Sequence, residues 1–152
     1  MTNKINCWLL KSEPQGYSID DLKRDKKTFW TGVRNFQARN FMQAMKKGDM
    51  CLFYHSGKET SVVGVAKVTA AAQPDPTQFV KGGHYFEPRA TKEKPVWFCP
   101  EIQFVKKFND PVNLGVIKAD RALEGMVLRA KSRLSVQPVS EKHFNYILKE
   151  LA

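Results

Sequence analysis

The chain has 152 residues, with 25 Lys and Arg against 15 Asp and Glu, which gives a formal net charge of +10. With 42% hydrophobic and 26% charged residues, its composition excludes a largely disordered protein. No apolar run approaches the roughly 18–20 residues of a membrane span, and the N-terminus lacks the apolar core of a signal peptide. We therefore expect one domain over residues 1–152, in the cytoplasm, or in the nucleus if the source is eukaryotic, with no membrane partner.

The first third of the chain predicts one strand and two helices. A strand over residues 6–11 ends at Pro14, which cannot donate to a strand ladder. Ser18 is placed as the N-cap of a short helix that runs to Asp25. A second helix is predicted from Asn35 to Lys47 and closed by Gly48, because four apolar residues recur at helical spacing: Ala38, Phe41, Met42 and Met45.

Strands dominate the rest of the chain. They are predicted over residues 50–55, 62–69, 96–107 and 134–136. Gly64 suggests a bulge or a close backbone approach, and Pro100 requires a bulge or an edge position.

The remaining elements are two helices and a long loop. A short helix is expected over residues 114–119 and a terminal helix after Ser140, while residues 71–95 predict a loop rich in proline and glycine. This mixed order without a βαβ rhythm predicts an α+β fold around a curved sheet or small barrel.

Three cysteines, Cys7, Cys51 and Cys99, are odd in number and widely spaced, which argues against a disulfide framework and against a CxxC metal site. We expect buried, reduced thiols, no metal and no cofactor. The net charge favours a polyanionic partner, although a basic solubilising surface is the alternative. The basic residues are spread along the chain, which fits a folded basic surface better than a disordered arm.

Catalytic signals are weak. Ser12, His55 and an acid such as Glu13 or Asp49 provide the residue types of a hydrolytic triad, but no GxSxG elbow surrounds the serine. The three histidines show no HExxH spacing, and the glycines form neither a dinucleotide-binding nor a P-loop motif. The sequence therefore favours a binding protein over an enzyme.

The segment from Trp30 to Asn40 carries the most information about binding. It is predicted to be a loop entering a helix, and it combines an aromatic ring, two arginines, two asparagines and a glutamine. Amide side chains can bind base edges, an aromatic face can stack on a base, and a helix N-terminus attracts anions. The alternative is that Trp30 and Phe36 belong to the core while Arg34 and Arg39 are solvated.

Three other polar strings follow predicted strands: Lys11 to Pro14, Phe53 to Ser56, and Ser135 to Pro138. Strand ends of this kind can line the rim of a cavity. Together with residues 30–40, they provide the ingredients of a partly apolar pocket with a few polar groups.

Six strings resemble the EVE-domain family, and together they extend over nearly the whole chain: Trp8 to Pro14, Tyr17 to Leu22, Trp30 to Asn40, Phe53 to Ser56, Tyr85 to Pro88, and Arg133 to Val139. The resemblance implies a PUA-like pseudo-β-barrel with surrounding helices, related to YTH and ASCH domains. It also implies a reader of modified nucleic-acid bases, notably modified cytosines in DNA such as 5-methylcytosine. The family string usually reads Trp-Asp-Gly-Val-Arg-Asn-Tyr, so Thr31 and Phe36 depart from it, and the ligand preference is not carried over in detail.

We hypothesise a non-catalytic reader in which a flipped base stacks near Trp30 and is bound by Ser12, Asn35 and Gln37 or nearby backbone. Alternatives are an RNA-binding module, an enzyme using Ser12, His55 or Glu13, and a small-molecule sensor. The expected ligand-binding residues are Lys11, Ser12, Glu13, Trp30, Val33, Arg34, Asn35, Gln37, Tyr54, His55, Ser56, Ser135, Gln137 and Pro138. The expected contacts to the nucleic-acid backbone are Arg39, Lys46, Lys47, Arg129, Lys131 and Arg133.

Overall fold

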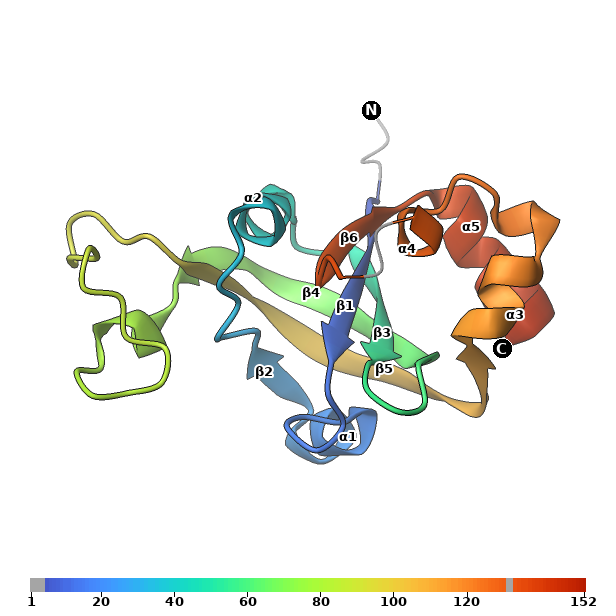
Figure 1. The fold of residues 1–152 in the computed structure, drawn as a ribbon, viewed down its shortest axis with the longest axis horizontal. Helices are drawn as coiled ribbons and strands as arrows, with labels where there is room; N and C mark the ends of the chain where they lie inside the picture. Colours follow the sequence, from blue (N-terminus) through green and yellow to red (C-terminus); the bar gives the residue numbers. More distant parts are fainter. Residues whose placement is uncertain (1–4, 131–132) are drawn as a thin grey trace.

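A six-stranded curved sheet forms the centre of the molecule (Figure 1). The computed structural model describes residues 5–130 and 133–152. The spatial order of the strands is β2-β5-β4-β3-β1-β6. Their bounds are β1 Cys7–Ser12, β2 Lys27–Phe29, β3 Met50–His55, β4 Ser61–Pro74, β5 Phe98–Asn113 and β6 Val136–Val139.

The pairing of β1 with β3 positions the site. These two strands are parallel, in register from Cys7 with Met50 to Ser12 with His55. Their carboxyl ends therefore lie at the same edge of the sheet. This brings the polar strings Lys11 to Pro14 and Phe53 to Ser56 close together. The other pairs are antiparallel, and β6 pairs with β1 so that Lys11 N donates to the carbonyl of Ser135 at 2.9 Å.

Each face of the sheet carries its own core, because side chains alternate along the strands. Trp8 and Leu10 of β1 pack on one face with α1 (Ile19–Asp25) and α2 (Phe36–Ala44). Leu9 packs on the opposite face with α5 (Glu141–Tyr146) and the η3 turn (Ile147–Leu151). The short elements α3 (Leu114–Ala119), η2 (Arg121–Leu123) and α4 (Val127–Ala130) also contribute buried residues.

Local signals place the helix starts correctly. Ser18 and Asp21 form a reciprocal capping box on α1, while the side chain of Asn35 accepts from Ala38 N at the start of α2. Ser140 caps α5 in the same way. The α+β class and the curved sheet are confirmed.

The predicted end of the second helix is wrong. α2 ends at Ala44 and not at Lys47, because residues 45–49 form a turn closed by a buried carboxylate. Asp49 is 3% exposed and accepts from Lys46 N at 2.9 Å and from Trp8 Nε1 at 3.0 Å. This contact between distant segments overrides the local helical signal.

Several strand limits also differ from the prediction. β4 extends to Pro74 and β5 to Asn113, so the two form a long ribbon through several bulges. β6 begins at Val136 instead of Leu134, and β2 was not predicted. Part of the expected 71–95 loop is therefore strand, followed by a 3₁₀ turn, η1 (Pro76–Phe79).

The expectations for the cysteines and for the irregular strand residues are confirmed. Cys7, Cys51 and Cys99 are buried and free. Pro100 lies at a break in the β4–β5 register, where its carbonyl accepts from Trp30 N at 2.9 Å. Within the part of the chain that the structure describes, no helix is long and apolar enough to span a membrane.

Gly64 marks a close approach between backbones. A Cβ at this position would collide with the carbonyl oxygen of Lys106 and would lie 2.9 Å from Ile19 Cδ1. The carbonyl belongs to the neighbouring strand and has little freedom to move.

We predict that Gly64→Ala lowers the free energy of unfolding by about 1–3 kcal/mol, as overpacking typically does. Gly16→Ala is the matched control, since the nearest atom to its Cβ would be the Glu13 oxygen at 3.5 Å. Urea denaturation measures both. Equal stability of the two variants would show that the β4–β5 ribbon yields easily.

Candidate nucleic-acid interface

A cavity of about 550 Å³ lies where β1 ends, next to the segment that joins β2 to α2. We call it the Trp30 cavity. It is within the usual size range of small-ligand sites. It is lined by Lys11, Ser12, Glu13, Gly16, Tyr17, Thr28, Phe29, Trp30, Thr31, Gly32, Val33, Arg34, Tyr85 and Ser135.

The end of β1 supplies the polar wall. Ser12 Oγ donates to the carbonyl of Tyr17 at 2.7 Å, which fixes the turn after the strand. Lys11 Nζ lies 5.4 Å from the centre of the Tyr54 ring, and burial lowers the pKa of Lys11 to about 8. An acceptor or anion in the cavity would favour the charged form of this lysine.

Aromatic rings form the apolar walls. Trp30 is 8% exposed and contacts Tyr17 and Phe53 edge to face, at ring-centre distances of 6.2 and 5.5 Å. Tyr85, which is 41% exposed, packs against Gly32 from the opposite side. Gly32 has φ +85°, and any Cβ there would lie 2.9 Å from Tyr85 Cζ, so this contact requires glycine.

A buried carboxylate joins these walls. Asp75 has no exposed surface and accepts from Gly32 N at 2.8 Å and from Arg34 at 3.2 Å. It also accepts from the backbone and hydroxyl of Thr77. Burial opposes ionisation of Asp75, but these hydrogen bonds outweigh it and hold its pKa below the usual value of 3.8.

The loop after β4 is held in shape by further polar contacts. The amide of Gln78, which is fully buried, donates to the carbonyls of Asp75 and Trp97 and accepts from the backbone N–H groups of Val96 and Trp97. Trp97 Nε1 donates to Glu87 at 3.0 Å. Residues 75–97 therefore form a fixed arm, seen at the left of Figure 1, that presents Tyr85 to the cavity.

Two interpretations of residues 30–40 were open: a binding segment, or core aromatic rings with solvated arginines. Neither describes the arginines fully. Arg34 donates to Asp75, to Thr77 and to the carbonyl of Tyr85 at 2.8 Å, so it anchors the arm. Arg39 covers the ring of Phe36 and donates to Val96 O at 3.1 Å. Phe36 itself is 48% exposed and is not a core residue.

The structure divides the predicted ligand-binding residues between separate sites instead of gathering them in one pocket. Seven line the Trp30 cavity: Lys11, Ser12, Glu13, Trp30, Val33, Arg34 and Ser135. Gln37 and Pro138 line a different hollow of about 600 Å³, beside α4. His55 and Ser56 line a third cavity. Tyr54 and Gln137 are buried, and Asn35 is the N-cap of α2.

Sequence reasoning missed several residues of the cavity. Tyr17, Thr28 and Phe29 belong to a turn and a three-residue strand that have no periodic signal of their own. Tyr85 was part of the family-like string Tyr85 to Pro88, but its place depends on Asp75 and Arg34, which hold the arm.

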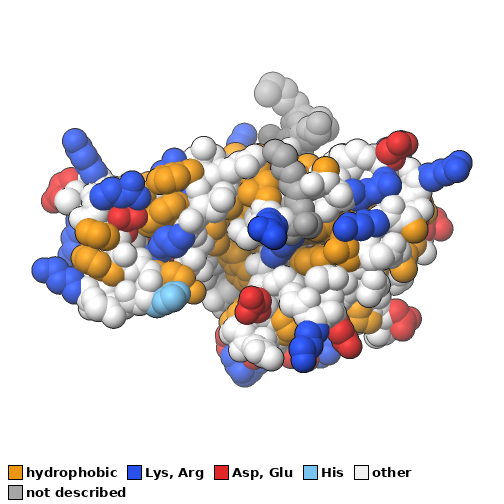
Figure 2. All heavy atoms as spheres, viewed as in Figure 1, with side chains coloured by type: hydrophobic (Ala, Val, Ile, Leu, Met, Phe, Trp, Pro, Cys, Tyr) orange, Lys and Arg blue, Asp and Glu red, His pale blue; other side chains and the backbone are white. Residues whose placement is uncertain are grey.

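Lys and Arg side chains lie to either side of this region. Figure 2 shows Lys and Arg on both sides of a central depression, which lies between the arm and α1. Among the predicted backbone contacts, Lys46, Lys47 and Arg133 are exposed. Arg39 and Arg129 are partly covered and hydrogen-bonded to carbonyls, and Lys131 lies outside the described residues.

The residues considered for catalysis do not form a relay. Ser12 donates to Tyr17 O, whereas His55 Nε2 accepts from the backbone N–H of Ile19 at 3.0 Å. Asp49 bonds to Trp8 and to backbone groups. Over residues 5–130 and 133–152, no group of three His, Cys, Asp or Glu is placed to hold a metal ion.

The family model for the EVE domain matches residues 6–150. The chain belongs to the EVE domain family. Human thymocyte nuclear protein 1 is 38% identical to this EVE domain, over 97% of the chain and 75% of the relative. A hypothetical protein from Leishmania major superimposes with a TM-score of 0.91 at 48% identity, covering 95% and 93% of the two chains.

A third similar structure is that of human THYN1 protein in complex with 5-methylcytosine containing DNA. It superimposes on this EVE domain with a TM-score of 0.88 at 37% identity, covering 94% of this chain and 95% of that one. These likenesses confirm the PUA-like pseudo-barrel architecture that the resemblance implied.

We predict that Asp75→Asn lowers the free energy of unfolding of this EVE domain by about 1–3 kcal/mol at pH 7, because Arg34 and Gly32 lose a charged acceptor. The folded pKa of Asp75 is lowered, so its contribution is present above about pH 3.8 and disappears as the pH falls through the folded pKa. Urea titrations at several pH values measure this.

The exposed Asp110 provides the control: Asp110→Asn removes a carboxylate from the surface of β5. If both variants matched the wild type at pH 7, the carboxylate of Asp75 would not hold the arm.

Proposed function

We propose that the protein is a non-catalytic reader of nucleic acid, which binds a flipped, modified base in the Trp30 cavity. A modified cytosine in DNA is the expected ligand. The observation that carries the proposal is the cavity itself: polar groups at the end of β1 face a half-exposed tyrosine across a space sized for a small ligand.

The walls suit a planar base. Tyr85 has enough exposed surface to stack on a base, whereas Trp30 is mostly covered and would form the floor. Lys11 and Ser12 offer groups that can hydrogen-bond to the base edge. Removing the base from the duplex costs a few kcal/mol, and stacking returns about 1–3 kcal/mol.

The charge of the chain supplies affinity that does not depend on sequence. With a net charge of +10, the protein attracts phosphates, and exposed cations such as Lys46, Lys47 and Arg133 are proposed to contact them. The cations thus provide affinity for any nucleic acid, and the Trp30 cavity provides specificity for the modified base.

DNA is favoured over RNA by one comparison. The human THYN1 structure at 37% identity was obtained with 5-methylcytosine containing DNA. An RNA-binding module is the second candidate, and competition between the two nucleic acids at fixed salt separates them.

Binding without turnover is supported by the contacts of Ser12 and His55. Both side chains bond to backbone of the segment that leads into α1, Ser12 to the Tyr17 carbonyl and His55 to the Ile19 N–H, and within the described residues no hydrogen bond joins the side chain of Ser12 to that of His55. We therefore expect oligonucleotides to be recovered chemically unchanged after incubation.

We predict that Tyr85→Ala weakens binding to a duplex containing 5-methylcytosine by about tenfold, because one stacking face is lost. Fluorescence anisotropy with paired modified and unmodified duplexes measures both affinities. The preference for the modified duplex should fall in this variant.

Phe86→Ala is the matched control, since Phe86 has a similar exposure of 36% on the same arm but does not line the cavity. The base-reader proposal fails if wild type binds both duplexes equally and Tyr85→Ala leaves both affinities unchanged.

A second prediction separates the affinity for phosphates from the specificity for the modified base. Replacing Lys46 and Lys47 with Gln should reduce the slope of log K against log salt by about one for each lost phosphate contact. The ratio of modified to unmodified affinities should stay constant. Lys149→Gln, at the far C-terminal turn, is the control, and an altered ratio would place these lysines in base selection.

A further inference from the structure

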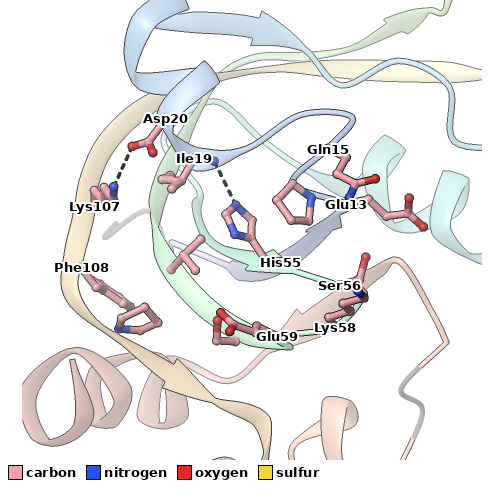
Figure 3. Close-up of a pocket in the computed structure, with 15 residues that line it drawn as sticks. Glu13, Gln15, Ile19, Asp20, His55, Ser56, Lys58, Glu59, Lys107 and Phe108 are labelled. Carbon is pink, nitrogen blue, oxygen red and sulfur yellow. Dashed lines mark hydrogen bonds and ion pairs between the residues drawn. The ribbon is translucent and has the colours of Figure 1, made fainter.

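The cavity lined by His55 and Ser56 has a volume of about 610 Å³ and shares one lining residue, Glu13, with the Trp30 cavity. We call it the His55 cavity. Figure 3 shows His55 near the middle of the lining residues, next to Ile19, with Lys107 and Phe108 of β5 on one side and Glu13 and Ser56 on the other. Its apolar wall includes Ile19, Val63 and Phe108.

His55 offers a fixed donor to this cavity. Its Nε2 accepts from the backbone N–H of Ile19 at 3.0 Å, so the neutral ring carries its proton on Nδ1. Burial lowers the pKa of His55, with Lys107 adding to the effect and Asp20 opposing it, which favours this neutral form.

Nδ1 is the ring nitrogen that is not bonded to Ile19, and it points into the group of lining residues (Figure 3). Within residues 5–130 and 133–152, no hydrogen bond joins Nδ1 to protein, and Nδ1 is not among the buried polar atoms that lack a partner. The Nδ1–H group is therefore accessible to an acceptor in the cavity.

The charges around the cavity disfavour a phosphate strand. Three carboxylates line it, against two ammonium groups, although the whole chain is strongly basic. One of those ammonium groups is already neutralised, because Lys107 donates to Asp20 at 2.8 Å. Glu13 and Glu59 remain as acceptors for a ligand N–H group.

We propose that the His55 cavity is a second ligand site, separate from the nucleic-acid site, for a small uncharged molecule that carries an amide or lactam group. The carbonyl of the ligand accepts from His55 Nδ1–H, and its N–H donates to a carboxylate on the rim. The flat apolar part packs against Ile19, Val63 and Phe108. The proposal does not depend on the proposed base reading.

Benzamide and benzoate are a matched pair of probes, since they share a ring and differ in charge. The expected result is that benzamide shifts the ¹⁵N and ¹H signals of the His55 imidazole, with a Kd on the order of 1 mM for so small a ligand. Benzoate should bind at least tenfold more weakly, because it lacks a donor and meets Glu13 and Glu59.

His55→Phe should abolish benzamide binding, and His143→Phe, which lies on α5 outside the cavity, should retain it. The backbone N–H of Ile19 loses its acceptor in His55→Phe, so thermal melting checks that this variant is folded. If it is not, the titration of the wild type with benzamide and benzoate decides the proposal. Saturating benzamide should leave affinity for the duplex unchanged.

The proposal is overturned if benzamide leaves the His55 signals unmoved up to its solubility, or if benzoate binds equally well. It is also overturned if a folded His55→Phe still binds benzamide, or if duplex DNA displaces it. The last result would make the cavity part of the nucleic-acid site.

Discussion

The buried carboxylate of Asp75 determines the form of the candidate interface. It accepts from Gly32 and Arg34, which line the Trp30 cavity, and from Thr77 on its own arm. Residues 30–35 and the arm of residues 75–97 are far apart in sequence, and Asp75 joins them together with Arg34, which also donates to the carbonyl of Tyr85. These contacts hold Tyr85 beside Gly32, where it forms one wall of the cavity.

The carboxyl ends of β1 and β3 lie at one edge of the sheet but line different cavities. Ser12 at the end of β1 lines the Trp30 cavity with Lys11 and aromatic rings, in a region with Lys and Arg side chains to either side. His55 at the end of β3 faces a cavity whose rim carries more carboxylates than ammonium groups. The parallel pairing thus places the proposed nucleic-acid site beside the proposed second ligand site, and Glu13 lines both cavities.

Short-range signals were sufficient where a contact lies within one turn of chain. The Ser18 capping box and the Asn35 cap were predictable for that reason. Long-range contacts defeated prediction: Asp49 ends α2 early through contacts with β1, and β2 forms because β5 is beside it. In the site, Lys11, Ser12 and Trp30 follow from strand ends and family-like strings. Tyr85 also lies in a family-like string, but its place in the cavity could not be predicted, because nothing near it in sequence reveals that Asp75 and Arg34 hold its arm.

A crystal structure of the protein with a duplex containing one 5-methylcytosine tests the central claim most directly. We predict that the modified cytosine leaves the helix and occupies the Trp30 cavity, stacked on Tyr85 and within hydrogen-bond distance of Lys11 or Ser12. A cytosine that stays paired in the duplex, with protein contacts confined to phosphates, would contradict the account. So would a flipped base in the His55 cavity.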